Sequence, residues 1–247
     1  MNLRRGRVSR RGLCRNLQKS IMVNHMNKTF CVIPAYNEAA TIYQVILAVK
    51  PLVDQIVVVD DGSTDQTFNL AKKTGVTVLK HLINRGQGAA LRTGTEYALN
   101  SGAKIIVHFD ADGQFLSTDI IRVIEPIITG QAEIVFGSRF LADSVANLPR
   151  LKKYFILPLA KLVNKLFFQI NLTDPQSGFR AMTSQVAKQI SWQQDRMAHC
   201  SEILGQAKYH QFKIKEVPIK VIYFHFGQKL IDGLKIVKEI IFAKLIS

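Results

Sequence analysis

Short apolar runs alternate along the chain with longer segments in which apolar residues recur every three to four positions. Each short run is rich in β-branched or aromatic side chains, which predicts a buried strand. Five such strands are expected, at residues 30–33, 56–59, 76–79, 105–109 and 134–136. The periodic segments predict helices at residues 38–50, 64–74, 88–100 and 118–129. This alternation predicts an α/β fold with a mostly parallel sheet and helices on both faces.

The rhythm changes after residue 139. The pattern there predicts a long apolar and basic stretch, a polar loop, a helix, a strand and a closing amphipathic helix, at residues 148–170, 173–180, 201–210, 217–223 and 229–246. Residues 1–28 have weak periodicity, and we interpret them as a basic, unstructured extension. A nucleic-acid-binding arm and a targeting peptide remain alternatives for this segment. Residues 29–247 are expected to form a single domain.

The chain of 247 residues carries 33 Lys and Arg against 18 Asp and Glu, a formal net charge of +15. Such a charge favours a polyanionic partner. Nucleic acid, an anionic membrane surface and a phosphate-rich substrate are the classes that it suggests. Residues 1–25 hold seven basic and no acidic residues, residues 26–149 are near neutral, and residues 150–247 carry a net +10. The near-neutral middle argues against a nucleic-acid-binding protein.

Composition excludes several other classes. A hydrophobic content of 47% supports a packed core, which excludes a wholly disordered chain. No run of 18 apolar residues occurs, so we expect no transmembrane helix. The three cysteines, Cys14, Cys31 and Cys200, form neither a disulfide framework nor a zinc motif, and they suit a reducing cytoplasm.

Polar clusters follow the first four predicted strands. They occupy residues 34–38, 60–65, 84–88 and 110–114. One such cluster is an ordinary turn, but parallel strands bring their carboxyl ends to the same edge of a sheet, where ligands bind. The four clusters together therefore predict a binding site.

Asp110 and Asp112 stand two residues apart at a strand end, so both side chains point the same way in extended backbone. Two such carboxylates repel each other unless a cation lies between them. Mg²⁺ or Mn²⁺ fits, with Gln114 as a further oxygen ligand, although a plain Asp-Gly turn is the alternative. Gly86 and Gly88 open the helix that follows the third predicted strand, where backbone N–H groups could approach phosphate.

Together with Gly137-Ser138-Arg139, these clusters resemble glycosyltransferase family 2, which implies a GT-A fold. The sequences DPQSGFR at 174–180 and EVPI at 216–219 resemble the dolichyl-phosphate mannose or glucose synthase group. The resemblance implies a Rossmann-like donor half at residues 29–140, which binds the nucleotide sugar. It also implies an acceptor half with amphipathic helices at residues 141–247.

The resemblance also implies roles for individual residues. The nucleotide sugar would be bound by Pro34, Tyr36, Glu38, Asp60, Asp61, Asn84, Gly86 and Gly88. Asp110, Asp112 and Gln114 would hold the metal on the diphosphate. Catalytic roles fall to Asp112, to Arg139 and Arg180 at phosphate, and to Glu202 facing the acceptor. Arg150 and Lys229 would guide an anionic acceptor.

The expected function is metal-dependent, inverting transfer of a hexose from a GDP- or UDP-sugar to a polyprenyl phosphate. Basic and apolar residues between 152 and 168 and between 234 and 245 suggest peripheral contact with the cytoplasmic face of the membrane. Two alternatives remain. A family 2 enzyme acting on a saccharide hydroxyl would need a carboxylate base, for which Glu202 is the late candidate. The other alternative is a basic nucleic-acid-binding protein.

Overall fold

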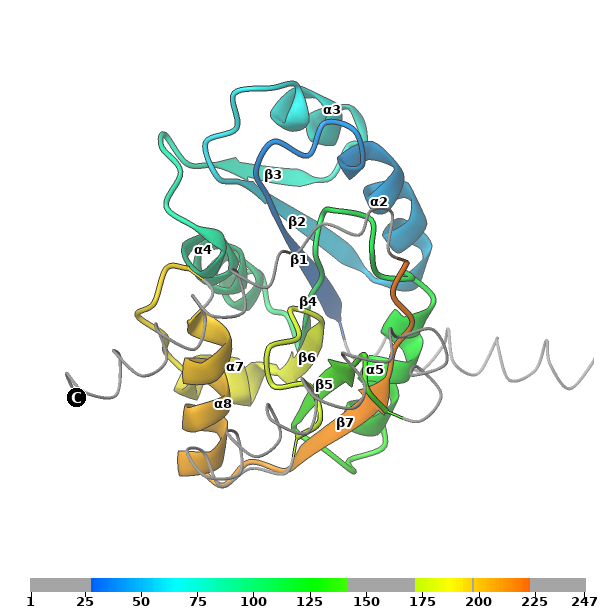
Figure 1. Cartoon of the computed structure of the whole chain (residues 1–247), viewed down its shortest axis with the longest axis vertical. Helices are drawn as coiled ribbons and strands as arrows, with labels where there is room; N and C mark the ends of the chain where they lie inside the picture. Colours follow the sequence, from blue (N-terminus) through cyan, green and yellow to red (C-terminus); the bar gives the residue numbers. More distant parts are fainter. Residues whose placement is uncertain (1–27, 142–171, 197, 223–247) are drawn as a thin grey trace, which may run out of the picture.

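The computed structural model describes residues 28–141, 172–196 and 198–222 (Figure 1). Within these residues the chain forms one seven-stranded sheet in the order β3-β2-β1-β4-β6-β5-β7. The strands are β1 Thr29–Ala35, β2 Gln55–Asp60, β3 Thr77–Lys80, β4 Ile105–His108, β5 Ile134–Ser138, β6 Arg180–Thr183 and β7 Ile214–Pro218. The sheet therefore continues across residue 140, from the expected donor half into the expected acceptor half.

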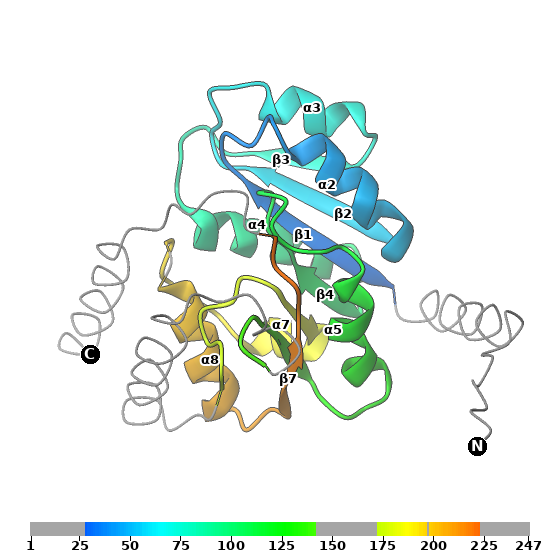
Figure 2. The same ribbon diagram turned by 45° about the vertical axis from the view of Figure 1, so that its right-hand side comes forward.

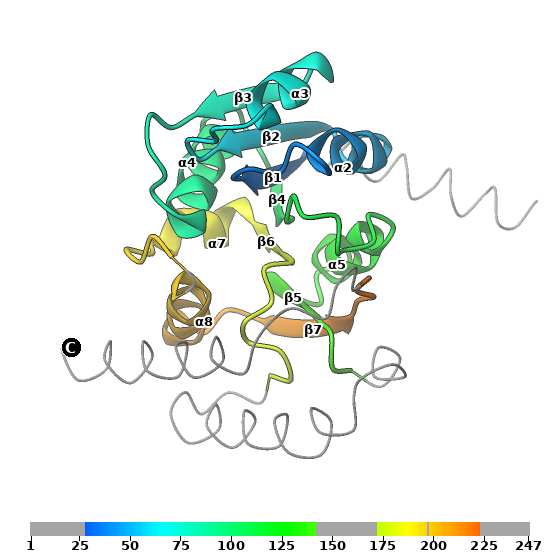
Figure 3. The ribbon, with the colours of Figure 1, turned by 45° about the horizontal axis from the view of Figure 1, so that its top comes forward.

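Helices cover both faces of this sheet (Figures 1 and 3). The helices are α2 Ile42–Val49, η1 Lys50–Leu52, α3 Thr67–Lys73, α4 Gln87–Asn100, α5 Asp119–Ile128, α7 Ser184–Gln189 and α8 His199–Tyr209. Buried residues of α2, α3 and α5 belong to one core cluster, and those of α4, α7 and α8 belong to a second. The predicted α/β fold, with helices on both faces, is confirmed.

The strand β1 shows why two cores form. Phe30 and Val32 pack into the second cluster, whereas Cys31 and Ile33 pack into the first. Successive side chains of a strand point to opposite faces, so a continuous apolar run feeds both cores. The helix α4 lies close to β1. A Cβ on Gly94 would lie only 2.3 Å from Val32 Cγ1, so the close approach requires glycine at this position.

Strand directions divide the sheet into two parts. The strands β3, β2, β1 and β4 are mutually parallel, so their carboxyl ends lie at one edge, as predicted. The strand β6 is antiparallel to both β4 and β5, and β7 is parallel to β5. In Figure 2 the parallel strands β1 to β4 lie above β7, the last strand of the mixed part. The mixed part positions the second wall of the site described below.

Four element predictions need correction. The helix expected at 64–74 is α3, which begins at Thr67. The helix expected from residue 38 begins at Ile42, because residues 38–41 form a turn in which the Glu38 carbonyl accepts the N–H groups of Thr41 and Ile42. The strand expected at 217–223 is β7 at Ile214–Pro218. The polar loop expected at 173–180 ends in β6, and both β6 and α7 were missed.

Several predictions concern residues that the structure does not describe. These are the basic extension at 1–27, the apolar stretch at 148–170 with Arg150, and the helix at 229–246 with Lys229. Among the described residues, no helix combines the length and apolarity that crossing a bilayer requires.

Candidate active site

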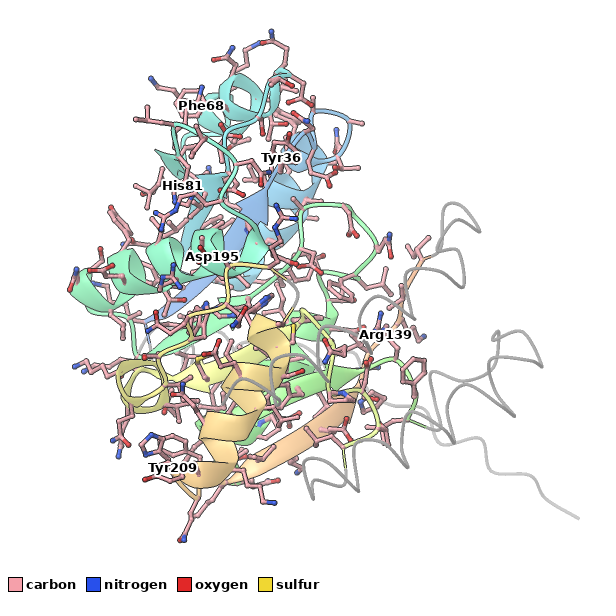
Figure 4. All side chains as sticks on the ribbon, turned by 60° about the vertical axis from the view of Figure 1, so that its left-hand side comes forward. Tyr36, Phe68, His81, Arg139, Asp195 and Tyr209 are labelled. Atoms are coloured by element: carbon pink, nitrogen blue, oxygen red, sulfur yellow. The ribbon has the colours of Figure 1, made fainter. Side chains whose placement is uncertain are left out.

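A cavity of about 430 Å³ opens at the carboxyl ends of β1 to β4. All four predicted polar clusters contribute to its wall, because these parallel strands end at the same edge. The residues from these clusters are Pro34, Ala35, Tyr36, Glu38, Asp61, Asn84, Gly86, Gln87, Asp110, Ala111, Asp112 and Gln114. A second wall includes Arg139, Gln176, Gly178, Cys200 and Val221. Tyr36 and Arg139, labelled in Figure 4, belong to these two walls.

Asp110 and Asp112 place two carboxylates in the first wall, directly after β4. Burial, and then the charge of Asp112, raise the pKa of Asp110 to about 7. Burial also raises the pKa of Asp112. Gln87 Nε2 donates to Asp110 Oδ1 at 2.7 Å, and the Gln114 N–H donates to Asp112 Oδ1 at 2.9 Å. A nearby cation would stabilise the charged forms of these carboxylates, which burial disfavours.

The carboxylates of Asp110 and Asp112 are suitable ligands for a hard divalent cation that also binds a substrate. Among the described residues, no group of three His, Cys, Asp or Glu side chains is placed to hold a metal ion by itself. Mg²⁺ is commonly held by one or two carboxylates together with water and substrate phosphates, and carboxylate oxygens also suit Mn²⁺. Asp110 and Asp112 match that arrangement, so the chemistry of the site fits the predicted metal.

Arg139 follows β5 and is fixed by a bidentate ion pair with the buried Asp174. Its Nε lies 2.6 Å from Oδ2, and its Nη2 lies 2.8 Å from Oδ1. Asp174 is fixed in turn, because the Glu216 carboxylate of β7 accepts the backbone N–H groups of Thr173 and Asp174. A bidentate pair sets the plane of the guanidinium. The cavity wall thus gains one oriented cation.

Asp61 holds the turn that precedes α4. Its carboxylate accepts the backbone N–H of Arg85 at 3.0 Å and that of Gly86 at 2.6 Å. Gly86 has a φ of 104°, a conformation that favours glycine. The end of β2 therefore determines where Asn84, Gly86 and Gln87 lie in the wall.

Comparison with known proteins agrees with this geometry. The family described as glycosyl transferase family 2 matches residues 30–191. The chain belongs to glycosyl transferase family 2. It is therefore a glycosyltransferase that uses a nucleotide sugar, and the cavity lies among the strand ends that the family match covers.

Two relatives extend the family 2 match over most of the chain. An uncharacterized protein of Methanocaldococcus jannaschii is 38% identical over 238 residues, which cover 92% of this chain and 98% of the relative. The UDP-N-acetylglucosamine–dolichyl-phosphate N-acetylglucosaminyltransferase of Methanococcus voltae is 36% identical over 241 residues, 87% of this chain and 96% of the relative.

The glucosyl-3-phosphoglycerate synthase of Mycobacterium tuberculosis, solved with Mn²⁺, UDP-glucose and phosphoglyceric acid, has a similar structure. The TM-score is 0.68 at 21% identity, and the match covers 94% of this chain and 80% of that one. At this identity the likeness supports the fold, which is the GT-A arrangement expected for family 2.

Four of the expected family 2 site residues do not line the cavity: Asp60, Gly88, Arg180 and Glu202. Asp60 is fully buried, and its Oδ1 accepts the backbone N–H of Ser63 at 3.3 Å. Its neighbour Asp61 lines the cavity instead. The order of the two carboxylates along β2 explains this, because only the second extends beyond the strand end.

Arg180 lies within the sheet rather than in the cavity wall. It begins β6 between β4 and β5, and it is fully buried. Its Nη2 lies 3.1 Å from Cys200 Sγ and 3.3 Å from His199 Nε2. Its positive charge acts to lower the pKa of Asp110, against the stronger effect of burial. Arg180 therefore acts on the Asp110 carboxylate from within the sheet. It does not line the cavity, where the sequence predicted that it would meet phosphate.

Gly88 and Glu202 both serve the loop at residues 191–196. The Gly88 N–H donates to the Asp195 carbonyl at 2.8 Å, and a Cβ on Gly88 would lie 2.3 Å from the Gln194 carbonyl oxygen. The Glu202 carboxylate accepts the N–H groups of Gln193 and Gln194, each at 2.9 Å. The N–H groups of Gly86 and Gly88, expected to face phosphate, thus bond to Asp61 and to this loop.

Among the wall residues that were not predicted, three carry a side-chain amide or thiol: Gln87, Gln176 and Cys200. Gln87 and Gln176 lie within motifs that the sequence analysis quoted, and their amide groups could have been considered as ligands. Gln176 Nε2 donates to Ser201 Oγ at 2.7 Å, whereas its buried Oε1 has no partner among the described residues. Cys200 gives no local signal, because a lone cysteine in a helix is usually a core residue.

Proposed function

We propose that the chain transfers a hexose from a UDP- or GDP-sugar to a polyprenyl phosphate, with inversion at the anomeric carbon. The proposal rests on one observation above all, the paired carboxylates of Asp110 and Asp112 in the wall of the strand-end cavity. They would hold Mg²⁺ or Mn²⁺ against the donor diphosphate, with Gln114 beside them.

The reaction breaks the bond between the anomeric carbon and the diphosphate, and an acceptor phosphate oxygen bonds to the opposite face of that carbon. A bound divalent cation would supply charge neutralisation for the departing diphosphate. Arg139, oriented by Asp174, would add a fixed positive charge. The nucleoside and ribose would lie against Pro34, Tyr36, Glu38, Asp61 and Asn84.

A phosphate acceptor suits the charges of the site better than a hydroxyl acceptor does. A phosphate oxygen is already deprotonated, whereas a sugar hydroxyl needs a general base. Glu202, the candidate base for a hydroxyl acceptor, instead accepts two backbone N–H groups of the 191–196 loop. The name of the Methanococcus voltae relative, which includes dolichyl phosphate, supports the same choice.

A polyprenyl acceptor resides in a bilayer, so we also propose peripheral association with the cytoplasmic face of a membrane. The net charge of +10 over residues 150–247 supports this, because anionic lipids attract basic surfaces. Arg150 and Lys229 stay predictions for acceptor guidance. Nucleic acid is not a proposed partner.

The test is a transfer assay with the purified full-length chain. Radiolabelled UDP-glucose, UDP-N-acetylglucosamine and GDP-mannose are each offered with undecaprenyl phosphate in detergent, or with a saccharide that has free hydroxyls. Each pair is run with Mn²⁺, with Mg²⁺ and with EDTA. We expect label in the organic phase with at least one donor, and none with EDTA.

Product analysis completes this test. The anomeric configuration of the lipid-linked sugar, determined by NMR, should be opposite to that of the donor. Transfer to the saccharide without transfer to undecaprenyl phosphate would overturn the acceptor proposal. Full activity in EDTA would overturn the metal proposal.

A further inference from the structure

His81 makes a connection in the nucleotide-side wall that the proposed chemistry does not use. His81 Nδ1 lies 2.6 Å from Asp61 Oδ1, and Nε2 lies 3.0 Å from the Thr93 hydroxyl on α4. An ionised carboxylate only accepts hydrogen bonds, so Nδ1 carries the proton in this arrangement. Nε2 faces the Thr93 hydroxyl, so both ring nitrogens have a hydrogen-bond partner.

The pair is shielded from solvent on both sides. The His81 side chain is 9% exposed and that of Asp61 is 4% exposed. The His81 backbone is fixed as well, because its N–H donates to the Asp60 carbonyl at 2.9 Å. His81, which is labelled in Figure 4, does not line the cavity, whereas Asp61 does. An interaction with an ionised acceptor in such a place is stronger than a neutral hydrogen bond.

The connection continues beyond Asp61 to the metal-side carboxylate. Asp61 accepts the N–H groups of Arg85 and Gly86, and the next residue, Gln87, donates to Asp110 at 2.7 Å. A continuous set of hydrogen bonds and one short turn therefore joins α4 and the ends of β2 and β3 to Asp110, two residues after β4. A shift of the Asp61 carboxylate would therefore move the cavity wall at residues 84–87, including Gln87, whose amide donates a hydrogen bond to Asp110.

We infer that His81 is a positioning residue for nucleotide-sugar binding, which fixes the Asp61 carboxylate and through it the turn at residues 84–87. His81 touches no substrate. The inference rests on the proposed function only in taking the cavity as the place where the nucleotide binds. The two ring nitrogens contact different residues, Asp61 and Thr93, so one substitution can remove the first contact and another the second.

The experiment compares His81→Asn with His81→Gln. The amide of Asn lies near the position of Nδ1, so it retains the donor to Asp61 and loses Thr93. The amide of Gln lies near the position of Nε2, so it retains Thr93 and loses Asp61. Thr93→Val removes the Thr93 hydroxyl alone, and His210→Gln changes an exposed histidine at the end of α8 as a control.

Binding of UDP and GDP with Mg²⁺ is measured by calorimetry, and KM and kcat are measured for the preferred nucleotide sugar. We expect His81→Gln to raise Kd and KM about tenfold, the size of one hydrogen bond to a charged group. His81→Asn, Thr93→Val and His210→Gln should stay within about threefold of the wild type, because each retains the donor to Asp61.

A second measurement does not depend on the nucleotide. Hydrogen exchange of the Arg85 and Gly86 amides, in protein without ligand, should be about tenfold faster in His81→Gln than in His81→Asn. A purely structural histidine would lower the melting temperature in both variants and leave these two differences absent, which would overturn the inference. If the wild type binds neither UDP nor GDP, the proposed function fails, and the exchange result still decides the role of His81.

Discussion

The carboxylates around the cavity fall into two groups that differ in how their charge is compensated. At the ends of β1 and β4, burial raises the pKa of Glu38, Asp110 and Asp112. In the mixed part of the sheet, Asp174 forms a bidentate pair with Arg139, and Glu216 accepts two backbone N–H groups. The ionised forms of the first group stay disfavoured despite the hydrogen bonds that they accept, whereas the charges of the second group are compensated internally.

This difference separates two uses of the same side chain. A carboxylate whose charge costs free energy gains most from an external cation, so it marks a ligand site. A carboxylate surrounded by internal donors holds a loop in place. The motif at 174–180 thus shapes the wall through Asp174, whereas the cluster at 110–114 is the one that we propose to hold the metal. The following substitutions test this division.

The largest effect is expected from Asp112→Ala. Loss of a metal carboxylate should reduce the initial rate of transfer by about a thousandfold, equivalent to about 4 kcal/mol, while the melting temperature stays near that of the wild type. Glu96→Ala, which removes an exposed carboxylate on α4, should leave the rate unchanged. A fully active Asp112→Ala variant would refute the assignment.

The raised pKa of Asp110 predicts a pH dependence in protein kept free of metal with EDTA. Its folded-state pKa of about 7 lies above the unfolded value, so the folded state retains a proton that the unfolded state has released. The free energy of unfolding of the wild type, minus that of Asp110→Asn, should therefore fall as pH rises from about 4 to about 7, by at most about 4 kcal/mol.

Subtracting the variant is necessary because His199, whose pKa burial lowers to about 4, has the opposite effect. Unfolding releases that ring to take up a proton, so its contribution rises with pH through the same interval. Urea titrations at several pH values give both curves. A constant difference between the two proteins would show that Asp110 is not destabilised in its charged form.

Asp174→Asn tests the compensated group. It breaks the bidentate pair and leaves the partly buried Arg139 guanidinium with less compensation, so the free energy of unfolding should fall by about 3 kcal/mol. The control is Asp195→Asn, which breaks the more exposed pair with Arg92 and should cost less than about 1 kcal/mol. Equal losses in the two variants would remove the distinction between the groups.

A smaller effect is expected from Gly88→Ala. The new Cβ would meet the Gln194 carbonyl, so α4 and the 191–196 loop must separate, at a cost of about 2 kcal/mol of stability. Gly205→Ala in α8 meets no atom within 4 Å and should instead stabilise the protein by about 0.5 kcal/mol. Thermal denaturation of the two variants would contradict this if both shifted in the same direction.

The parallel part of the fold was predictable from local pattern, because its strands are apolar runs between amphipathic helices. The strand β6 was not predictable in this way. It has four residues and begins with Arg180, a side chain that is almost always exposed unless paired. Only the surrounding structure, with Asp110 and His199 close by, explains why a guanidinium occupies the middle of the sheet.

The candidate site was predictable where chemistry follows a strand end directly, as with Asp61, Asp110 and Asp112. It was not predictable where a contact spans a long stretch of chain. Glu202 was predicted to face the acceptor and Gly88 to bind the nucleotide sugar. Their partners are instead backbone groups of a loop that sequence periodicity does not place. His81 was predicted, like the other histidines, to be a packing or surface residue, because its contacts with Asp61 and Thr93 leave no local signal in the sequence.

The chain contains a single tryptophan, Trp192, and its position gives the protein an internal optical reporter. The indole is buried, and its Nε1 donates to the Gly88 carbonyl at 2.8 Å, one residue from the cavity-lining Gln87. Indole emission responds to the polarity and hydrogen bonding around the ring. We therefore expect the emission of Trp192 to change when the neighbouring cavity is occupied, which would allow binding to be followed in real time without a label or a coupled assay.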